Sequence, residues 1–125
     1  MSHFGWGVPL DWREESDNGT YLYYSAAGIM ASASVSTLLE CPDGRAAPSL
    51  GDWESRLGTV DTAVALQVPG SGGGWRYRLS GGTQGPATVL RAWLPNCQRE
   101  LWITVYGAIG TADRIAATIV AQQDN

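Results

Sequence analysis

The sequence contains no lysine and a single histidine, and these scarcities exclude several kinds of chemistry. We expect His3, the only imidazole, to lie in a frayed terminus, so a Ser-His-Asp or Cys-His mechanism lacks its base. A histidine-based metal site lacks ligands for the same reason, and two cysteines are too few for a zinc site. The sequence therefore predicts no metal, no cofactor and no catalytic residue.

Basic charge and long apolar runs are also scarce. Eight basic residues, all arginine, stand against twelve acids, which gives a net charge of −4. An acidic chain lacks the basic field with which proteins bind nucleic acids. No apolar run approaches the roughly 18 residues that a membrane-spanning helix needs. We therefore expect a protein or a small molecule as the partner, with no nucleic acid and no membrane-spanning segment.

The composition that remains is typical of a folded protein. The chain has 125 residues, of which 44% are hydrophobic and 16% are charged, whereas disordered chains are poor in apolar residues and rich in charge. This length suits one core. We expect residues 1–125 to form a single globular domain.

Residues 17–20, Asp-Asn-Gly-Thr, give the strongest local signal. Asn-Gly supplies the two positive φ angles of a type I′ turn, so a hairpin is predicted in which Asp17 pairs with Thr20. Because strand side chains alternate between faces, the pairing assigns two sets of residues to opposite faces. One set is Trp12, Glu14, Tyr21 and Tyr23, and the other is Arg13, Glu15, Leu22 and Tyr24.

The rest of the chain shows short alternating segments separated by turns, with helical periodicity in two places. A helix that buries one apolar stripe needs a sheet face. We therefore predict an α+β fold: a twisted antiparallel sheet of six or seven strands with a short middle helix and a C-terminal helix. The alternative is a small β-barrel with one C-terminal helix. The further strands are expected at 29–39, 62–68, 75–80, 87–94 and 101–106, and the helices at 48–57 and 112–122.

The glycine-rich segment 70–74 admits two interpretations. Successive glycine amides can form an anion-binding nest. A phosphate loop, however, ends in Lys-Ser or Lys-Thr and precedes a helix, whereas a strand is predicted after this segment. A flexible hairpin loop is the favoured interpretation.

Six tryptophans and five tyrosines are the most informative feature, because large aromatic side chains fill cores and also form rigid binding platforms. Trp75 and Tyr77 alternate with two arginines along one strand, and an arginine and Trp93 share a face of the next. An Arg and aromatic surface can bind an anionic or aromatic group. The alternative is a solvent-facing strand whose arginines snorkel. The candidate binding residues are Tyr21, Tyr23, Trp75, Arg76, Tyr77, Arg78, Arg91 and Trp93.

Both cysteines lie in predicted turns, so a disulfide between Cys41 and Cys97 is predicted ahead of two free thiols. Such a bridge would stabilise the fold by roughly 4 kcal/mol on the chain-entropy model. It would also indicate an oxidising compartment.

Residues 7–12, GVPLDW, together with residues 100–107, ELWITVYG, and the helix predicted after them, resemble PsbP-like domains of the actinobacterial LpqN-type lipoprotein group. The resemblance implies an antiparallel sheet between helices and a binding or assembly role, and it brings no catalytic residue. Residues 96–99, NCQR, are similar to a segment of the extracellular sensor domains of mycobacterial receptor kinases.

These observations favour a non-enzymatic binding or assembly module. We expect it to come from an exported or cell-surface bacterial protein rather than a cytoplasmic one, and to use its aromatic and arginine residues. One alternative is a small-barrel cyclase or isomerase with an aromatic-lined apolar pocket. The other is a cytosolic chaperone or immunity-type partner protein that acts by surface complementarity.

Overall fold

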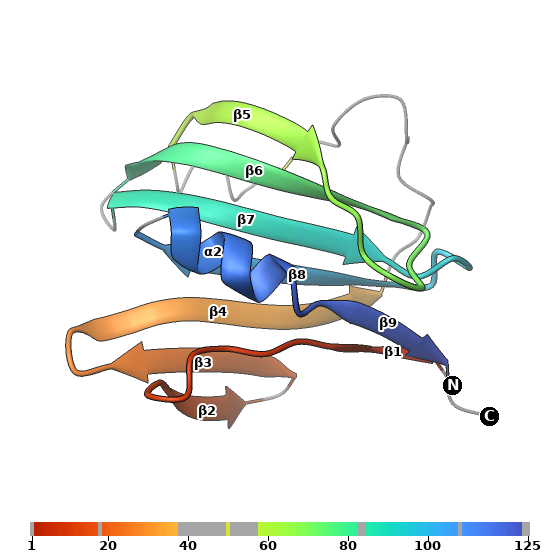
Figure 1. Cartoon of the computed structure of the whole chain (residues 1–125), viewed down its shortest axis with the longest axis horizontal. Helices are drawn as coiled ribbons and strands as arrows, with labels where there is room; N and C mark the ends of the chain where they lie inside the picture. Colours follow the sequence, from red (N-terminus) through yellow and green to blue (C-terminus); the bar gives the residue numbers. More distant parts are fainter. Residues whose placement is uncertain are drawn as a thin grey trace.

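The computed structural model of the chain describes residues 2–17, 19–37, 50, 58–82, 85–107 and 109–123. Within them, seven strands form one antiparallel sheet in the order β2-β3-β4-β8-β7-β6-β5, and two strands pair separately as β1-β9. The helix α2 (Ile109–Ala116) lies across one face of the sheet, and β1 and β9 lie side by side on that face (Figure 1). The strands are β1 (Ser2–Gly5), β2 (Arg13–Asp17), β3 (Thr20–Ser25), β4 (Gly28–Thr37), β5 (Val60–Ala65), β6 (Gly73–Gly82), β7 (Gly85–Trp93), β8 (Arg99–Tyr106) and β9 (Val120–Gln123).

The antiparallel α+β architecture with seven strands is confirmed, and the alternative of a closed barrel is wrong. β2 and β5 lie at opposite ends of the strand order, so the described strands form an open sheet. β5 to β8 form a meander in chain order, as do β2 to β4. The two meanders join where β4 pairs with β8, in a register that places Ala33 opposite Ile103.

The predicted hairpin is confirmed in its register. Asp17 pairs with Thr20 and Glu14 with Tyr23, so the assignment of side chains to the two faces is correct. Gly19 has a φ of 83°, the left-handed conformation that the turn requires. Asn18 lies outside the described residues.

The C-terminal helix is shorter than predicted. It ends at Ala116, and the chain then forms β9 instead of continuing as helix to residue 122. Thr118 explains the end of the helix: its Oγ1 donates to the Ile115 carbonyl at 2.6 Å and accepts from the Gly7 amide at 2.8 Å. After this anchor, the β-branched Val120 suits a strand.

The N-terminus is ordered as a strand, so the expectation of a frayed terminus at His3 is also wrong. His3 lies in β1 and pairs with Gln122 of β9. A terminal segment stays ordered when it is hydrogen-bonded to another element. The partner strand β9 falls in the segment for which a helix is predicted. Without that partner, the sequence gives no reason to expect β1 either.

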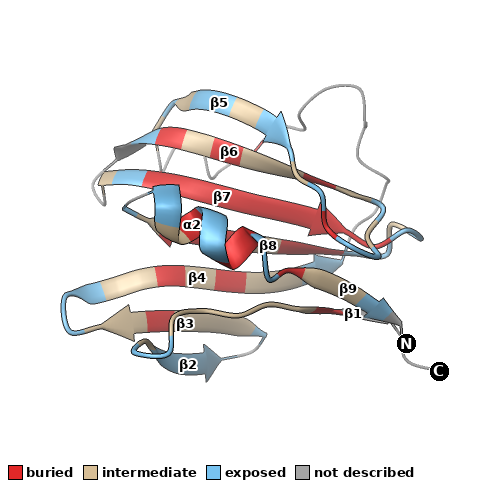
Figure 2. Ribbon diagram, in the orientation of Figure 1, coloured by how far each residue is buried: buried red, intermediate tan, exposed pale blue. Residues whose placement is uncertain are grey.

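The central strand β7 is buried over most of its length (Figure 2), and apolar clusters lie on both sides of it. On the α2 face, Leu90, Ile103 and the helix residue Ile115 belong to one apolar cluster. On the opposite face, Tyr77 and Val89 belong to a second cluster. β7 is buried without interruption from Ala87 to Trp93, as expected for a strand covered on both sides.

Two predictions fall on the part of the chain that is not described. The middle helix predicted at 48–57 lies outside the described residues except for Leu50, which is buried against the second cluster. Cys41 also lies outside them. Cys97 lies in the turn after β7 with a φ of 57°, and the described residues include no free cysteine. The bridge between Cys41 and Cys97 stays a prediction.

Candidate functional site

A cleft of about 340 Å³ lies where the connection between β5 and β6 meets the end of β7. Residues 65–68, residues 71–75 and Trp93 line it. The register places the side chains of Trp75 and Trp93 on the sheet face opposite α2, because Trp75 pairs with Arg91 and Gly73 with Trp93. Trp93 is buried and Trp75 is half-buried. The cleft therefore has one tryptophan as a fixed wall and another that is partly open to solvent.

Glycine makes the packing of this wall possible. A Cβ atom on Gly73 would lie 2.5 Å from the Trp93 ring, and one on Gly74 would lie 2.8 Å from the Arg91 carbonyl oxygen. No side chain fits at such distances, so the glycine run allows the backbone of β6 to contact the indole directly. The segment 70–74 connects two hairpin strands, but the loop predicted there is shorter than expected, because Gly73 and Gly74 already belong to β6. These two glycines have a packing role.

Backbone hydrogen bonds hold the rim of the cleft against three strands. The Leu66 amide donates to the Gly74 carbonyl at 2.9 Å, and the Gly72 amide donates to the Trp93 carbonyl at 2.8 Å. The Ala121 amide of β9 donates to the Pro69 carbonyl at 2.8 Å. These bonds hold the rim in one position, which limits the ordering cost when a ligand binds.

The polar side chains among the described lining residues are uncharged. The Ser71 hydroxyl donates to the Val68 carbonyl at 2.7 Å, which leaves the lone pairs of its oxygen available. Gln67 is exposed and makes no hydrogen bond with the other described residues. Among the described residues that line the cleft, none has a titratable side chain.

A buried ion pair lies next to this site on the same sheet face. Arg91 Nε is 2.7 Å from Glu100 Oε2, and both side chains are only 8% exposed. The guanidinium carbon of Arg91 lies 4.4 Å from the Trp102 ring centroid and 5.9 Å from that of Trp93. Arg91 Nη1 is buried without a hydrogen-bond partner among the described residues, so the ring contacts replace part of its lost hydration. The pair fixes the position of Arg91 behind Trp93.

The predicted binding residues do not form one surface. Trp75 and Trp93 line the cleft, and Arg91 lies behind them. Tyr77 shares their face but is 1% exposed in the second apolar cluster. The remaining four residues lie in two other places.

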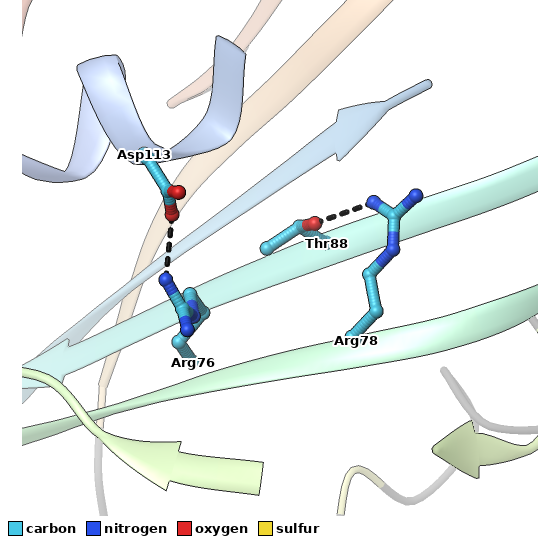
Figure 3. Close-up of polar contacts among 4 residues, drawn as sticks. All are labelled: Arg76, Arg78, Thr88 and Asp113. Carbon is cyan, nitrogen blue, oxygen red and sulfur yellow. Dashed lines mark hydrogen bonds and ion pairs between the residues drawn. The ribbon is translucent and has the colours of Figure 1, made fainter. Parts of the chain in front are cut away.

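Arg76 and Arg78 project from the opposite face of β6, where Arg76 reaches Asp113 of α2 and Arg78 reaches Thr88 of β7 (Figure 3). Arg76 Nη1 is 2.6 Å from Asp113 Oδ1 of the helix. Arg78 Nη1 donates to Thr88 Oγ1 at 2.8 Å and to the carbonyl of Gly107, just before the helix, at 3.0 Å. Both arginines therefore help to hold the helix region on the sheet.

Tyr21 and Tyr23 belong to an aromatic cluster with Trp6 and Trp12 on the α2 face. The Trp6 indole donates to the Tyr23 hydroxyl at 2.8 Å, which itself donates to Glu14 Oε1 at 2.8 Å. Trp6 meets Tyr21 edge to face, with the ring centroids 5.4 Å apart. Burial and the hydrogen bond to the Glu14 carboxylate raise the pKa of Tyr23 to about 12. These rings are packed against one another.

The residues that sequence reasoning missed are Gln67, Ser71 and Glu100. Ser71 lies within a glycine run that precedes a tryptophan, which is a usable signal, and Gln67 lies three residues before that run. Glu100 has no such signal, because its contact with Arg91 depends on the pairing of two strands.

No protein-family model matches the chain, and no curated protein matches its sequence. Among the described residues, no group of three or more His, Cys, Asp or Glu side chains is placed to hold a metal ion. No helix in the described part of the chain is long and apolar enough to cross a membrane.

Proposed function

We propose that the protein is a non-enzymatic binding module that holds its ligand in the cleft between the β5–β6 connection and Trp93. The observation that carries the proposal is the lining itself: tryptophan rings, an amide and a hydroxyl, with no titratable group among the described lining residues. General acid–base catalysis needs a group that titrates. Ser71 would need an adjacent base to act as a nucleophile, and its hydroxyl instead donates to the Val68 carbonyl.

The setting of the cleft supports binding in a second way. Its rim is tied by backbone hydrogen bonds to β7 and β9, and Trp93 packs on glycine backbone. A site built in this way is largely formed before the ligand arrives, as small-molecule sites usually are. The cyclase alternative requires a small barrel, whereas the described strands form an open sheet.

Membership of the PsbP-like group and an exported origin remain part of this proposal. A binding or assembly role agrees with that resemblance. Mass spectrometry of the protein purified without reductant tests the origin, because a bridged Cys41 and Cys97 indicate an oxidising compartment. Two alkylatable thiols in the native protein would instead favour the cytosolic partner-protein alternative.

The binding proposal is tested by a ligand-observed NMR screen of a library that contains both neutral and charged fragments. We expect fragments whose signals depend on the wild-type protein and are lost with Trp75→Ala. The matched control is Trp12→Ala, which removes a half-buried tryptophan from the other aromatic cluster and should leave binding intact. Gln67→Ala provides a second cleft variant at an exposed position, so that a folding defect in Trp75→Ala does not obscure the result. A screen with no fragment that depends on either cleft residue would overturn the proposal.

A further inference from the structure

We infer that the ligand of this cleft is a neutral carbohydrate of one or two rings. The inference rests on the proposed binding function and adds the ligand class. It follows from three properties of the described lining: the absence of charged side chains, the half-buried indole of Trp75, and the hydrogen-bond donors and acceptors that remain available.

The first property is charge. Among the described lining residues none is ionisable, and the nearby Arg91 is engaged by Glu100 at 2.7 Å. A charged ligand would lose hydration in the cleft without gaining an opposite charge, which is costly. The described part of the lining therefore selects against anions and cations.

The second property is the aromatic wall. Trp93 is covered by the backbone of β6, since even a Cβ atom on Gly73 would lie 2.5 Å from its ring. Trp75 packs against the second apolar cluster and is half-buried, so we infer that the part of its indole left open is the surface on which a ligand stacks. One aromatic platform suits the C–H face of a sugar ring, which is apolar while the ring edge is polar.

The third property is hydrogen bonding at the rim. The Ser71 hydroxyl hydrogen points to the Val68 carbonyl at 2.7 Å, so its oxygen is left as an acceptor. The Gln67 amide offers both donors and an acceptor. Hydroxyl groups of a ligand can donate to the Ser71 oxygen and can both donate to and accept from the Gln67 amide. A purely apolar ligand would desolvate them without replacement, at about 1–3 kcal/mol for each group.

The volume limits the size of the ligand. At about 340 Å³ the cleft is near the lower end of the range of roughly 300–1,000 Å³ for small-molecule sites. One or two sugar rings suit such a space, so a longer oligosaccharide would extend beyond it.

The test is saturation-transfer NMR with three neutral disaccharides: cellobiose, maltose and N,N′-diacetylchitobiose. We expect at least one to bind, and Trp75→Ala to weaken it at least about tenfold. Gln67→Ala and Ser71→Ala should each weaken it by a smaller factor of about three to ten, the loss expected for one hydrogen bond. Trp12→Ala should bind as the wild type does.

Two further probes separate the possible failures. Cellobiouronic acid differs from cellobiose by one carboxylate, and we expect it to bind at least about tenfold more weakly than cellobiose if cellobiose is a ligand. Indole tests an apolar planar ligand, and we expect no binding that depends on Trp75. If no disaccharide binds while indole or library fragments bind in a Trp75-dependent way, the carbohydrate inference is wrong and the binding function stands. Equal affinity for the acid and its neutral partner would also overturn the inference. If no probe depends on Trp75 or Gln67, both proposals fail.

Discussion

Two groups of aromatic residues in this protein each contain two tryptophans and lie in different environments. Near β3, four rings contact one another, and the hydroxyl of Tyr23 links the Trp6 indole to the Glu14 carboxylate. At the β5–β6 connection, Trp75 and Trp93 border a cleft with uncharged polar groups. The number of tryptophans therefore does not identify a binding surface. What distinguishes the two groups is the state of their polar atoms: the Tyr23 hydroxyl is bonded to both Trp6 and Glu14, whereas the Ser71 oxygen and the exposed Gln67 amide beside the cleft can still accept or donate hydrogen bonds.

The two groups also depend on different interactions. The cluster with Tyr23 is fixed by side-chain hydrogen bonds. The wall of the cleft is fixed by glycine backbone against Trp93 and by the buried pair of Arg91 and Glu100 behind it. Substitutions that remove one kind of support should affect one region and leave the other unchanged.

The largest effect is expected for Glu100→Ala. It leaves the Arg91 guanidinium buried without its carboxylate, and breaking a buried ion pair in this way costs about 3–5 kcal/mol. Urea denaturation measures the loss. The matched control is Glu15→Ala, which removes the exposed partner of Arg13 and should change stability by no more than about 0.5 kcal/mol. Similar losses of stability in Glu100→Ala and Glu15→Ala would show that the pair of Arg91 and Glu100 does not stabilise the sheet beside the cleft.

A smaller effect is expected for Gly70→Ala, at the rim of the cleft. A Cβ atom there would overlap the Ala121 carbonyl oxygen of β9, at a residue whose φ is already positive. We expect a loss of about 2–3 kcal/mol from the combined conformational strain and overlap.

The control for this variant is Gly19→Ala. Gly19 has a φ of 83°, close to the 78° of Gly70, but a Cβ atom on it would meet no described atom within 4 Å. Gly19→Ala should lower the free energy of unfolding by only about 1 kcal/mol, because it adds conformational strain without a steric overlap. Equal urea midpoints for the two variants would contradict a close contact between the rim and β9.

The smallest effect is expected for Tyr23→Phe in the other aromatic group. Removing the hydroxyl breaks its bonds to Trp6 and Glu14 and should cost about 1–2 kcal/mol at neutral pH. The ring remains, so the cleft and its ligand binding should not change.

This variant also predicts a pH dependence. Because the folded protein keeps the Tyr23 proton up to a pKa of about 12, the unfolded chain loses it first, near pH 10. The wild type should therefore lose stability as the pH rises from 10 toward 12, by up to about 1.4 kcal/mol per pH unit more than Tyr23→Phe does. Urea midpoints across the accessible part of this window measure the difference. Parallel pH profiles would contradict the raised pKa.

The parts of the fold that local signals determine could be predicted from the sequence. The Asn-Gly turn set the register of Asp17 against Thr20, and alternation placed β6 and β7 within a few residues of their observed bounds. The end of α2 could not be predicted, since the apolar periodicity continues through Ile119. Its end depends on the contact of Thr118 with Gly7, which lies 111 positions earlier.

The site was predictable to a similar extent. Alternation correctly separated Arg76 and Arg78 from the tryptophan face, and Trp75 and Trp93 were among the candidates that line the cleft. The different environment of Tyr23 was predictable only in part: Glu14 lies opposite it in the same hairpin, but the hydrogen bond from Trp6 comes from outside that hairpin. Long-range contacts decide which aromatic residues remain open to a ligand.

The most direct test of the difference between the two groups is an NMR titration of the six tryptophan indole groups of the chain, assigned by single Trp→Phe variants. The titrant is each compound that binds in the fragment screen or the disaccharide test. We predict that the indole signals of Trp75 and Trp93 shift with a common affinity while those of Trp6 and Trp12 stay in place. Shifts at Trp6 and Trp12 without shifts at Trp75 would contradict this account and place the binding site at the other aromatic group.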